Sequence, residues 1–222
     1  MAELATDIEQ RGDRVRFVIA TADPVAGACL SHMGYLPTGP AEFATRWFPA
    51  DARRVYGRFA ASIGPMVRQC ARLERVPWED ALLEAVRRLH GLDWWLYGSA
   101  ALAVRGLPVE PGDVDLNVGD PFAAGRRFDD VLVTPVERLD AWGAAYVGRA
   151  FCGAVVEWLA DPHLALDDPD DPHEQGPFVA GRLETVRWRG HDVRVPPLDV
   201  QLRVCERRGL TERAALIRAA LA

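Results

Sequence analysis

The sequence predicts an α+β protein, which combines helices with β-strands. Short runs of apolar, β-branched and aromatic residues alternate with longer stretches whose apolar residues recur at helical spacing. A chain of 222 residues, 49% hydrophobic and 26% charged, can also bury the sizeable core of such a fold. We expect three parts: a small N-terminal α/β module over 1–78, the main sheet domain over 79–196, and C-terminal helices over 197–222.

The N-terminal module is predicted to contain a strand over 14–20, where apolar residues alternate with arginines. A short helix over 24–32 follows, and the stretch 35–49 carries the glycine and proline residues of a connecting loop. From Asp51, apolar residues at helical spacing indicate a long helix. The pair Gly64-Pro65 is expected to kink this helix or to divide it in two.

The main domain is predicted to open with a helix over 77–90, which has acidic residues in its first turn and basic residues in its last. An apolar strand over 94–97 follows and ends in a turn at Gly98 and Ser99, after which a short helix begins. The next strand carries Asp113 and Asp115 in alternation. Side chains two apart on a strand point to the same face, so we expect the two carboxylates to project together.

Beyond this strand, two further strands are expected over 129–134 and 151–160, separated by a polar segment over 135–143 with helical character. Residues 161–177 form an acidic loop rich in proline. The remaining predicted elements are a hairpin that turns at Arg189-Gly190, a helix over 197–208, and a final helix from Thr211 to Ala222.

The composition excludes several kinds of chemistry. All 26 basic residues are arginine, which excludes lysine Schiff bases and the lysine-containing phosphate loop of P-loop enzymes. The net charge of −6 disfavours a protein built to follow a nucleic-acid backbone. The four cysteines and five histidines are scattered, so we expect buried thiols rather than a zinc or disulfide site. The polar, acidic N-terminus and the lack of long apolar runs predict a cytoplasmic protein without a membrane segment.

Two features of the stretch 94–119 suggest phosphate chemistry. The turn at Gly98-Ser99 allows close backbone approach, and free N–H groups at the start of a helix attract phosphate oxygens. Asp113 and Asp115 would repel each other unless a cation lay between them, and Mg²⁺ is commonly shared between protein carboxylates and substrate phosphates. Each feature occurs in many α/β proteins, but here only thirteen residues separate them.

This order and spacing resembles the signature of the polymerase-β-like nucleotidyltransferase superfamily, including its bacterial small-molecule and toxin-type members. The resemblance covers residues 79–222 and implies the nucleotidyltransferase fold, in which helices flank a mixed β-sheet. It implies that Gly98 and Ser99 contact the nucleoside triphosphate and that Asp113 and Asp115 hold two Mg²⁺ ions. It also requires a third carboxylate on a later strand, either as metal ligand or as base. Glu157 is the best match for that role, with Asp161 as the alternative.

The expected activity is Mg²⁺-dependent transfer of a nucleoside monophosphate from a triphosphate, with ATP as the expected donor, to a hydroxyl of a small molecule, releasing pyrophosphate. Arg105 is either a phosphate contact or a surface arginine at a helix end. The N-terminal module is either scaffold or one wall of an acceptor cleft. The acidic loop 161–177 either attracts a cationic acceptor, such as an aminoglycoside, or is simply solvated.

Three alternatives remain open at this level. A toxin-like enzyme would transfer the nucleotide to tRNA or protein, although the acidic net charge disfavours tRNA. A non-catalytic module on the same fold would bind nucleotide without reaction. The motif could also be a coincidence in an unrelated α/β protein.

Overall fold

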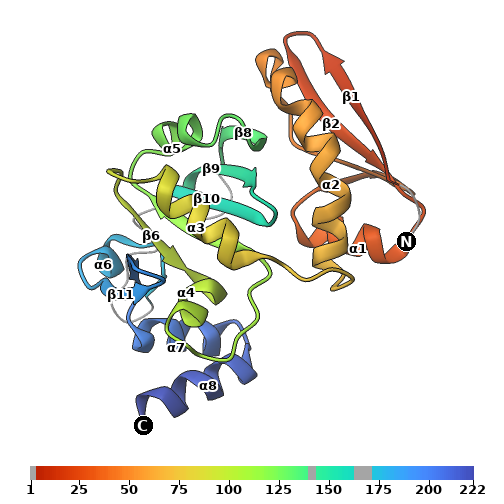
Figure 1. Cartoon of the computed structure of the whole chain (residues 1–222). Coiled ribbons are helices and arrows are strands. Elements are labelled where there is room, and N and C mark those ends of the chain that lie inside the picture. Colours follow the sequence, from red (N-terminus) through yellow and green to blue (C-terminus); the bar gives the residue numbers. More distant parts are fainter. Residues whose placement is uncertain (1–3, 140–143, 163–171) are drawn as a thin grey trace. The chain divides into compact units, whose positions relative to one another are not determined.

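A computed structural model describes residues 4–139, 144–162 and 172–222 (Figure 1). The chain divides into two units, Met1–Val76 with Asp130–Pro135, and Pro77–Asp129 with Val136–Ala222. Both units combine helices with β-sheet, so the fold belongs to the mixed α/β class. No helix in the described part of the chain has the length and apolar character needed to cross a membrane.

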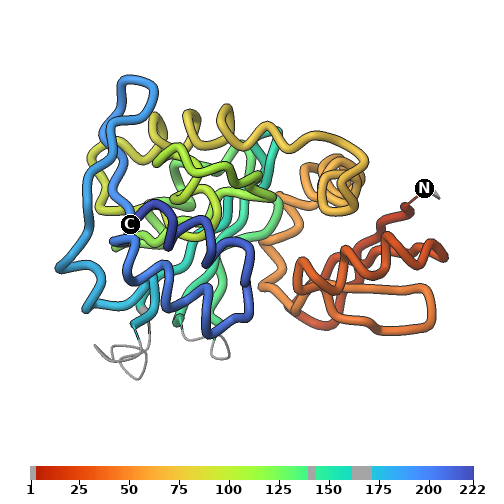
Figure 2. Tube along the Cα trace, turned by 90° about the horizontal axis from the view of Figure 1, so that it is seen from below, coloured from red at the N-terminus to blue at the C-terminus, as the bar shows by residue number. Residues whose placement is uncertain are grey.

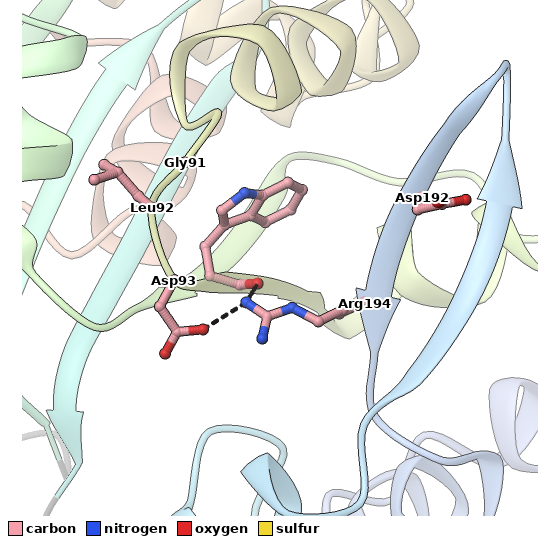
Figure 3. A pocket seen from close by; sticks show the side chains of 6 residues that line it. Gly91, Leu92, Asp93, Asp192 and Arg194 are labelled. Carbon is pink, nitrogen blue, oxygen red and sulfur yellow. Dashed lines mark hydrogen bonds and ion pairs between the residues drawn. The ribbon is translucent and has the colours of Figure 1, made fainter.

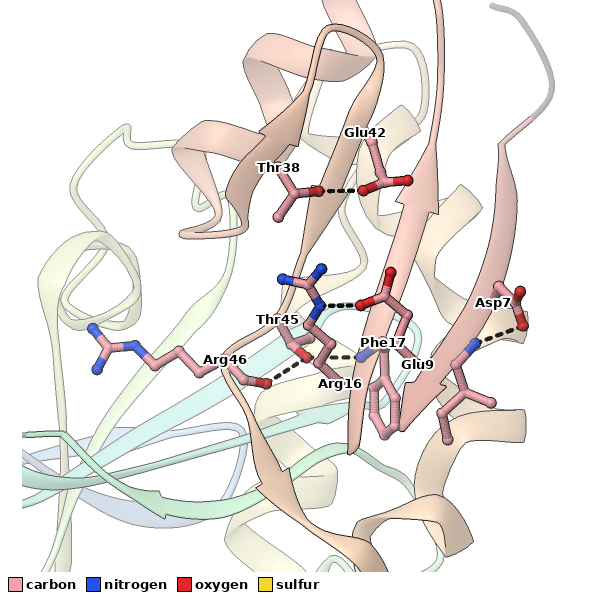
Figure 4. A network of polar contacts seen from close by, with 9 residues as sticks. Asp7, Glu9, Arg16, Phe17, Thr38, Glu42, Thr45 and Arg46 are labelled. Carbon is pink, nitrogen blue, oxygen red and sulfur yellow. Dashed lines mark hydrogen bonds and ion pairs between the residues drawn. The ribbon is translucent and has the colours of Figure 1, made fainter. Parts of the chain in front are cut away.

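The first unit is an antiparallel sheet packed against helices. Phe17 lies at the centre of its core, with ring centroids 5.5 Å from Phe48 and 4.9 Å from Phe59. The opposite face of the sheet is polar: Arg16 pairs with Glu9, its partner in the strand register (Figure 4). The strands follow the order β1-β2-β4-β3, with β5 paired to β2. Their bounds, and those of the helices, are β1 Ala5–Arg11, β2 Arg14–Ala20, α1 Pro24–His32, β3 Leu36–Gly39, β4 Glu42–Ala44, β5 Phe48–Pro49, the 3₁₀ helix η1 Ala50–Val55 and α2 Tyr56–Cys70.

The predicted strand over 14–20 and helix over 24–32 are confirmed, whereas the loop predicted over 35–49 is wrong. That stretch contains three short strands instead of a continuous loop. The helix α2 continues through Pro65, so Gly64-Pro65 does not divide it into two helices. Proline removes the hydrogen bond to the carbonyl four residues earlier, which belongs to Ala61. Ala61 is exposed, so water can satisfy that carbonyl and the helix tolerates the proline.

The second unit is built on a mixed sheet with the order β6-β7-β10-β9-β8, and it contains β8 from Val136 onward. The pairs β6–β7 and β10–β9 are antiparallel, and β7 and β10 run parallel. In chain order the strands are β6 Trp94–Tyr97, β7 Val114–Val118, β8 Leu132–Arg138, β9 Ala144–Phe151 and β10 Val155–Pro162. The two central strands, β7 and β10, carry the acidic residues that the sequence singled out.

Helices α3 (Trp78–Arg88) and α5 (Pro121–Arg127) contact the central strands of this sheet (Figure 1). On this covered face the indole of Trp158 stacks on Phe128 at 5.2 Å between ring centroids. Close packing there also explains Gly148, because a Cβ at that position would lie 2.2 Å from the Trp158 ring. Side chains alternate along a strand, so the neighbours of Trp158 in sequence point to the other face.

The remaining elements of this unit are the short helix that comes directly after β6 and the helices and hairpin of the C-terminal part of the chain (Figure 2). Leu102 of α4 packs with Cys205 of α7 and Ile217 of α8 in one apolar cluster. The hairpin of β11 and β12 turns at Arg189-Gly190 as predicted, and its second strand lies beside β6. Bounds are α4 Gly98–Val104, α6 Pro177–Ala180, β11 Glu184–Trp188, β12 His191–Val195, α7 Leu198–Arg207 and α8 Thr211–Leu221.

The predicted helices corresponding to α3, α4, α7 and α8 are confirmed. The helical character expected over 135–143 is wrong over the described residues, because β8 continues to Arg138. Residues 140–143 lie outside the described part. The strands β1 and β9 and the helices α5 and α6 have no counterpart in the predictions.

Candidate active site

A row of polar side chains crosses the sheet of the second unit on the face opposite Trp158. In the strand register Tyr97 lies opposite Asp115, and Asp115 lies opposite Glu157. Glu157 in turn lies opposite Arg149. Register partners project from the same face of a sheet, so these side chains are neighbours. Asp113 comes directly before the first residue of β7.

Gly98 brings the turn and the carboxylates together. It follows Tyr97 at the end of β6 and has a φ of +67°, in the left-handed region that favours glycine. A Cβ at this position would lie 2.7 Å from Oδ2 of Asp115, so the close approach requires the missing side chain. Ser99, the next residue, is buried. The two halves of the predicted motif are therefore in contact through Gly98 and Asp115.

The electrostatic environment of Asp115 is strongly acidic. Burial raises the pKa of Asp115 well above its usual value, and the charges of Asp113 and Glu157 raise it further. Glu174 acts in the same direction, while the positive charge of Arg208 opposes the increase. Carboxylates that are close together and partly desolvated are relieved by a cation. The row therefore has the charge of a cation-binding site.

Glu157 already has a cationic partner. Nε of Arg149 donates to Oε2 of Glu157 at 2.8 Å, and the Arg149 Nη2 group makes a second, shorter contact with the same oxygen. Both side chains are mostly buried, with exposed fractions of 18% and 17%. Such a pair contributes most where water is excluded. Arg149 thus neutralises the carboxylate that was expected to complete the metal site.

The chemistry of the acidic residues fits Mg²⁺, but a complete metal site is not preformed. Mg²⁺ is commonly bound by one or two carboxylates, with substrate phosphates and water as its other ligands. Asp113 and Asp115 can supply such a pair. Among residues 4–139, 144–162 and 172–222, no group of three His, Cys, Asp or Glu side chains is gathered in a metal-ligating arrangement. Of the three predicted metal ligands, Asp113 and Asp115 can supply a pair of carboxylates, while Glu157 is held in an ion pair with Arg149.

A short segment over 172–176 lies on the same face of the sheet. The Glu174 carbonyl accepts a hydrogen bond from Trp95 Nε1 at 2.9 Å, and the Gln175 carbonyl accepts one from Asn117 Nδ2 at 2.8 Å. Glu174 is only 5% exposed, and its carboxylate accepts a hydrogen bond from the Gly98 N–H at 3.1 Å. It also accepts from Gln201 Nε2 at 2.8 Å. Sequence patterns assign Glu174 only to an acidic loop, because nothing local indicates that its side chain turns inward.

Burial also raises the pKa of two other groups in this region. The pKa of Tyr97 lies well above its usual value because its phenol is buried and the negative charges of Asp115 and Glu157 are nearby. A hydrogen bond with the Gln175 side chain partly opposes that rise. Tyr97 therefore keeps its proton. The pKa of Glu174 is raised by burial, although its bonds with Gln201 and Gly98 favour the ionised form.

The other predicted site residues have different surroundings. Nη2 of Arg105 donates to Glu184 at 2.6 Å and to the Pro196 carbonyl at 2.8 Å, so the structure gives no support to a phosphate contact. Asp161, the alternative to Glu157, is exposed near the end of β10. Most of the acidic loop, including Asp167, Asp168, Asp170 and Asp171, lies outside the described residues.

The four cysteines are all free. Cys29 and Cys205 are buried as predicted, whereas Cys70 and Cys152 are only partly buried.

A cavity of about 430 Å³ lies beside the residues that lead into β6 (Figure 3). Asp115 is paired with Tyr97 at the other end of that strand. The cavity is lined by Trp94, the first residue of β6, and by Arg194 of β12. Arg194 pairs with Asp93 at 2.6 Å, and Asp192 pairs with Arg187 at 2.8 Å. These charges neutralise one another, and the cavity is separate from the acidic row.

The sequence matches no protein-family model and no curated protein. Its structure is similar to the crystal structure of a provisionally assigned nucleotidyltransferase from Thermotoga maritima, with 21% sequence identity and a TM-score of 0.48. The similar region covers 64% of this chain and 90% of the other.

Proposed function

We propose that this protein is a Mg²⁺-dependent nucleotidyltransferase that moves a nucleoside monophosphate from a triphosphate, with ATP as the expected donor, to an acceptor hydroxyl. One observation carries the proposal: the Asp115 carboxylate lies against Gly98, where a Cβ would come within 2.7 Å of its Oδ2. The contact joins a turn suited to phosphate with a carboxylate suited to metal. The electrostatic effect of Asp113 on Asp115 supports the same assignment.

The chain's own groups would act mainly by positioning and by charge. Gly98 and Ser99 would contact the triphosphate, as backbone groups and hydroxyls do at phosphate sites. Asp113 and Asp115 would hold Mg²⁺, which when bound neutralises phosphate charge and favours departure of pyrophosphate. Positioning and charge neutralisation account for most catalysis of phosphoryl transfer.

Glu157 would be the third carboxylate of the site. In its ion pair with Arg149 it has one oxygen, Oε2, occupied by the guanidinium. The other oxygen is the one that would take the proton of the acceptor hydroxyl or contact Mg²⁺. Arg149 would hold the carboxylate in place, because two donors on one oxygen restrict its rotation. The acceptor itself is expected to be a small molecule with a hydroxyl group.

The proposal is tested by incubating the protein with α-labelled nucleoside triphosphates, Mg²⁺ and a panel of hydroxylated small molecules, tRNA and proteins. Asp113→Asn is the matched variant, because it removes one charge and little volume. We expect label transfer by the wild type and a loss of at least about a hundredfold in the variant. Transfer that survives Asp113→Asn would show that the metal assignment is wrong.

The acceptor that becomes labelled separates the small-molecule enzyme from one acting on tRNA or protein. Nucleotide-dependent thermal stabilisation without any transfer would indicate a non-catalytic nucleotide-binding module.

A further inference from the structure

Glu174 is the buried carboxylate for which the proposed reaction has no role. Its side chain reaches Gly98 from a segment seventy-six residues further along the chain and accepts from the Gly98 N–H at 3.1 Å. Burial of a carboxylate is costly unless its oxygens are hydrogen-bonded. Gln201 supplies a second donor at 2.8 Å. The position is therefore built to hold an anionic oxygen away from water.

The residues around Glu174 keep it in this position. Its backbone carbonyl is bonded to Trp95, and the next carbonyl is bonded to Asn117. Gln201 is 2% exposed and also donates to the Gly98 carbonyl at 3.3 Å. Oε1 of Gln201 has no hydrogen-bond partner among the described residues. The amide is therefore held for its donor group, which faces the carboxylate of Glu174.

Two arginines provide further positive charge near this carboxylate. Arg208 follows α7 and Arg213 lies in α8, and both favour the ionised form of Glu174. Neither guanidinium forms an ion pair with another residue in the described part of the chain. A chain without lysine has only arginine and metal to neutralise a triphosphate. The positive groups that attract Glu174 are thus also available to phosphate.

We propose that Glu174 is an internal anion that occupies the phosphate position at Gly98 in the free protein, and that a nucleoside triphosphate must displace it to bind. This inference rests on the proposed function only in assigning the phosphates to Gly98. One N–H cannot donate fully to two anions, and two negative groups at this spacing repel. Glu174 therefore lowers the affinity for the substrate until the segment 172–176 moves away.

The size of the effect follows from the population of the open form. If Glu174 occupies the position in nine molecules of ten or more, the apparent affinity for the ligand is reduced about tenfold or more. Removing the carboxylate group should therefore tighten binding by about that factor, whereas replacing it with a neutral, weaker acceptor should tighten binding less. Glu174→Gln retains a carbonyl oxygen to accept from Gly98 and Gln201, so the fold should persist. Glu174→Ala removes the competing group altogether.

The test measures dissociation constants for MgATP and for inorganic tripolyphosphate with Mg²⁺ by titration calorimetry. Glu174→Ala should bind each ligand about tenfold more tightly than the wild type, and Glu174→Gln should show a smaller gain. Glu74→Gln is the charge-matched control, since Glu74 forms a surface pair with Arg68 in the first unit, and its constants should stay within about twofold of the wild type. Unchanged or weaker binding by Glu174→Ala overturns the inference.

A second measurement uses the unmodified protein. Hydrogen exchange in the peptide that contains residues 172–176 should become faster when MgATP binds, and unchanged or slower exchange overturns the inference. Tighter tripolyphosphate binding in the variants without any nucleotide transfer would support the internal anion and refute the proposed function. Transfer activity with no change in affinity would do the opposite.

Discussion

Replacing Gly98 with alanine should separate the cost of backbone strain from the loss of the site. Gly98 has a φ of +67°, and a non-glycine residue in this region costs about 1–2 kcal/mol. The new Cβ would stand 2.7 Å from Oδ2 of Asp115, whereas ordinary contact begins at 3.4 Å. The carboxylate must therefore retreat by about 0.7 Å, the difference between these distances. Displacements near 1 Å in an active site cost on the order of a hundredfold in rate.

Gly12→Ala is the matched control. Gly12 has a φ of +61° in the turn between β1 and β2, and a Cβ there would meet no atom within 4 Å. Gly12→Ala should lose about 1–2 kcal/mol of unfolding free energy, measured by urea denaturation, and Gly98→Ala should lose at least as much, because its Cβ also meets Asp115. Only Gly98→Ala should lose nucleotide transfer, by on the order of a hundredfold. Equal transfer activity in the two variants would refute the role given to the contact between Gly98 and Asp115.

Three further substitutions test separate parts of the site. Arg149→Gln leaves Glu157 mostly buried without its cationic partner, and it should lower the unfolding free energy by about 1–3 kcal/mol in chemical denaturation; an unchanged value would contradict the pair's importance. Arg105→Gln should lower the melting temperature by several degrees, since each kcal/mol of lost stability lowers it by about 2–4 °C in a chain of this size. Arg105 is bonded to Glu184 and to the Pro196 carbonyl, so the dissociation constant for MgATP should stay within about twofold of the wild type. A large loss of affinity would show that Arg105 does contact phosphate. The pKa of Glu174 is raised in the folded state, so its contribution to the unfolding free energy is fully present below the unfolded pKa of about 4.3 and is lost as the pH rises through the folded pKa. Glu174→Gln should therefore become more stable relative to the wild type as the pH rises through this range. A difference in unfolding free energy that does not change with pH would show that the pKa of Glu174 is not raised.

The central motif could be predicted because its parts are close in sequence. Gly98 directly follows a strand of four apolar residues, and Asp113 and Asp115 lie within the next seventeen residues of the chain. Alternation on a strand is a local property, so the sequence also indicates which residues share a face. Glu157 could be selected as a carboxylate in an apolar strand, and its place opposite Asp115 agrees with that selection.

The partners of these residues are not evident from the sequence. Arg149 lies only eight residues before Glu157, but the strand β9 that carries it is not predicted, because the small residues and glycine of β9 are unusual for a strand. Gly148 is explained only by the Trp158 ring that covers it. Likewise, Glu174 is one of many acidic residues in its loop, and its burial depends on bonds to Gly98 and Gln201. Long-range contacts of this kind leave no local pattern.

The most direct test of the central claim is the binding of a non-hydrolysable ATP analogue, which requires no knowledge of the acceptor. Titration calorimetry would compare the wild type with Asp115→Asn, each with Mg²⁺ and with a chelator. If Gly98, Asp113 and Asp115 form one site for metal and triphosphate, the wild type should bind the analogue with Mg²⁺ and lose at least about tenfold in affinity under either change. Binding that is equally tight with the chelator and in Asp115→Asn would contradict the account.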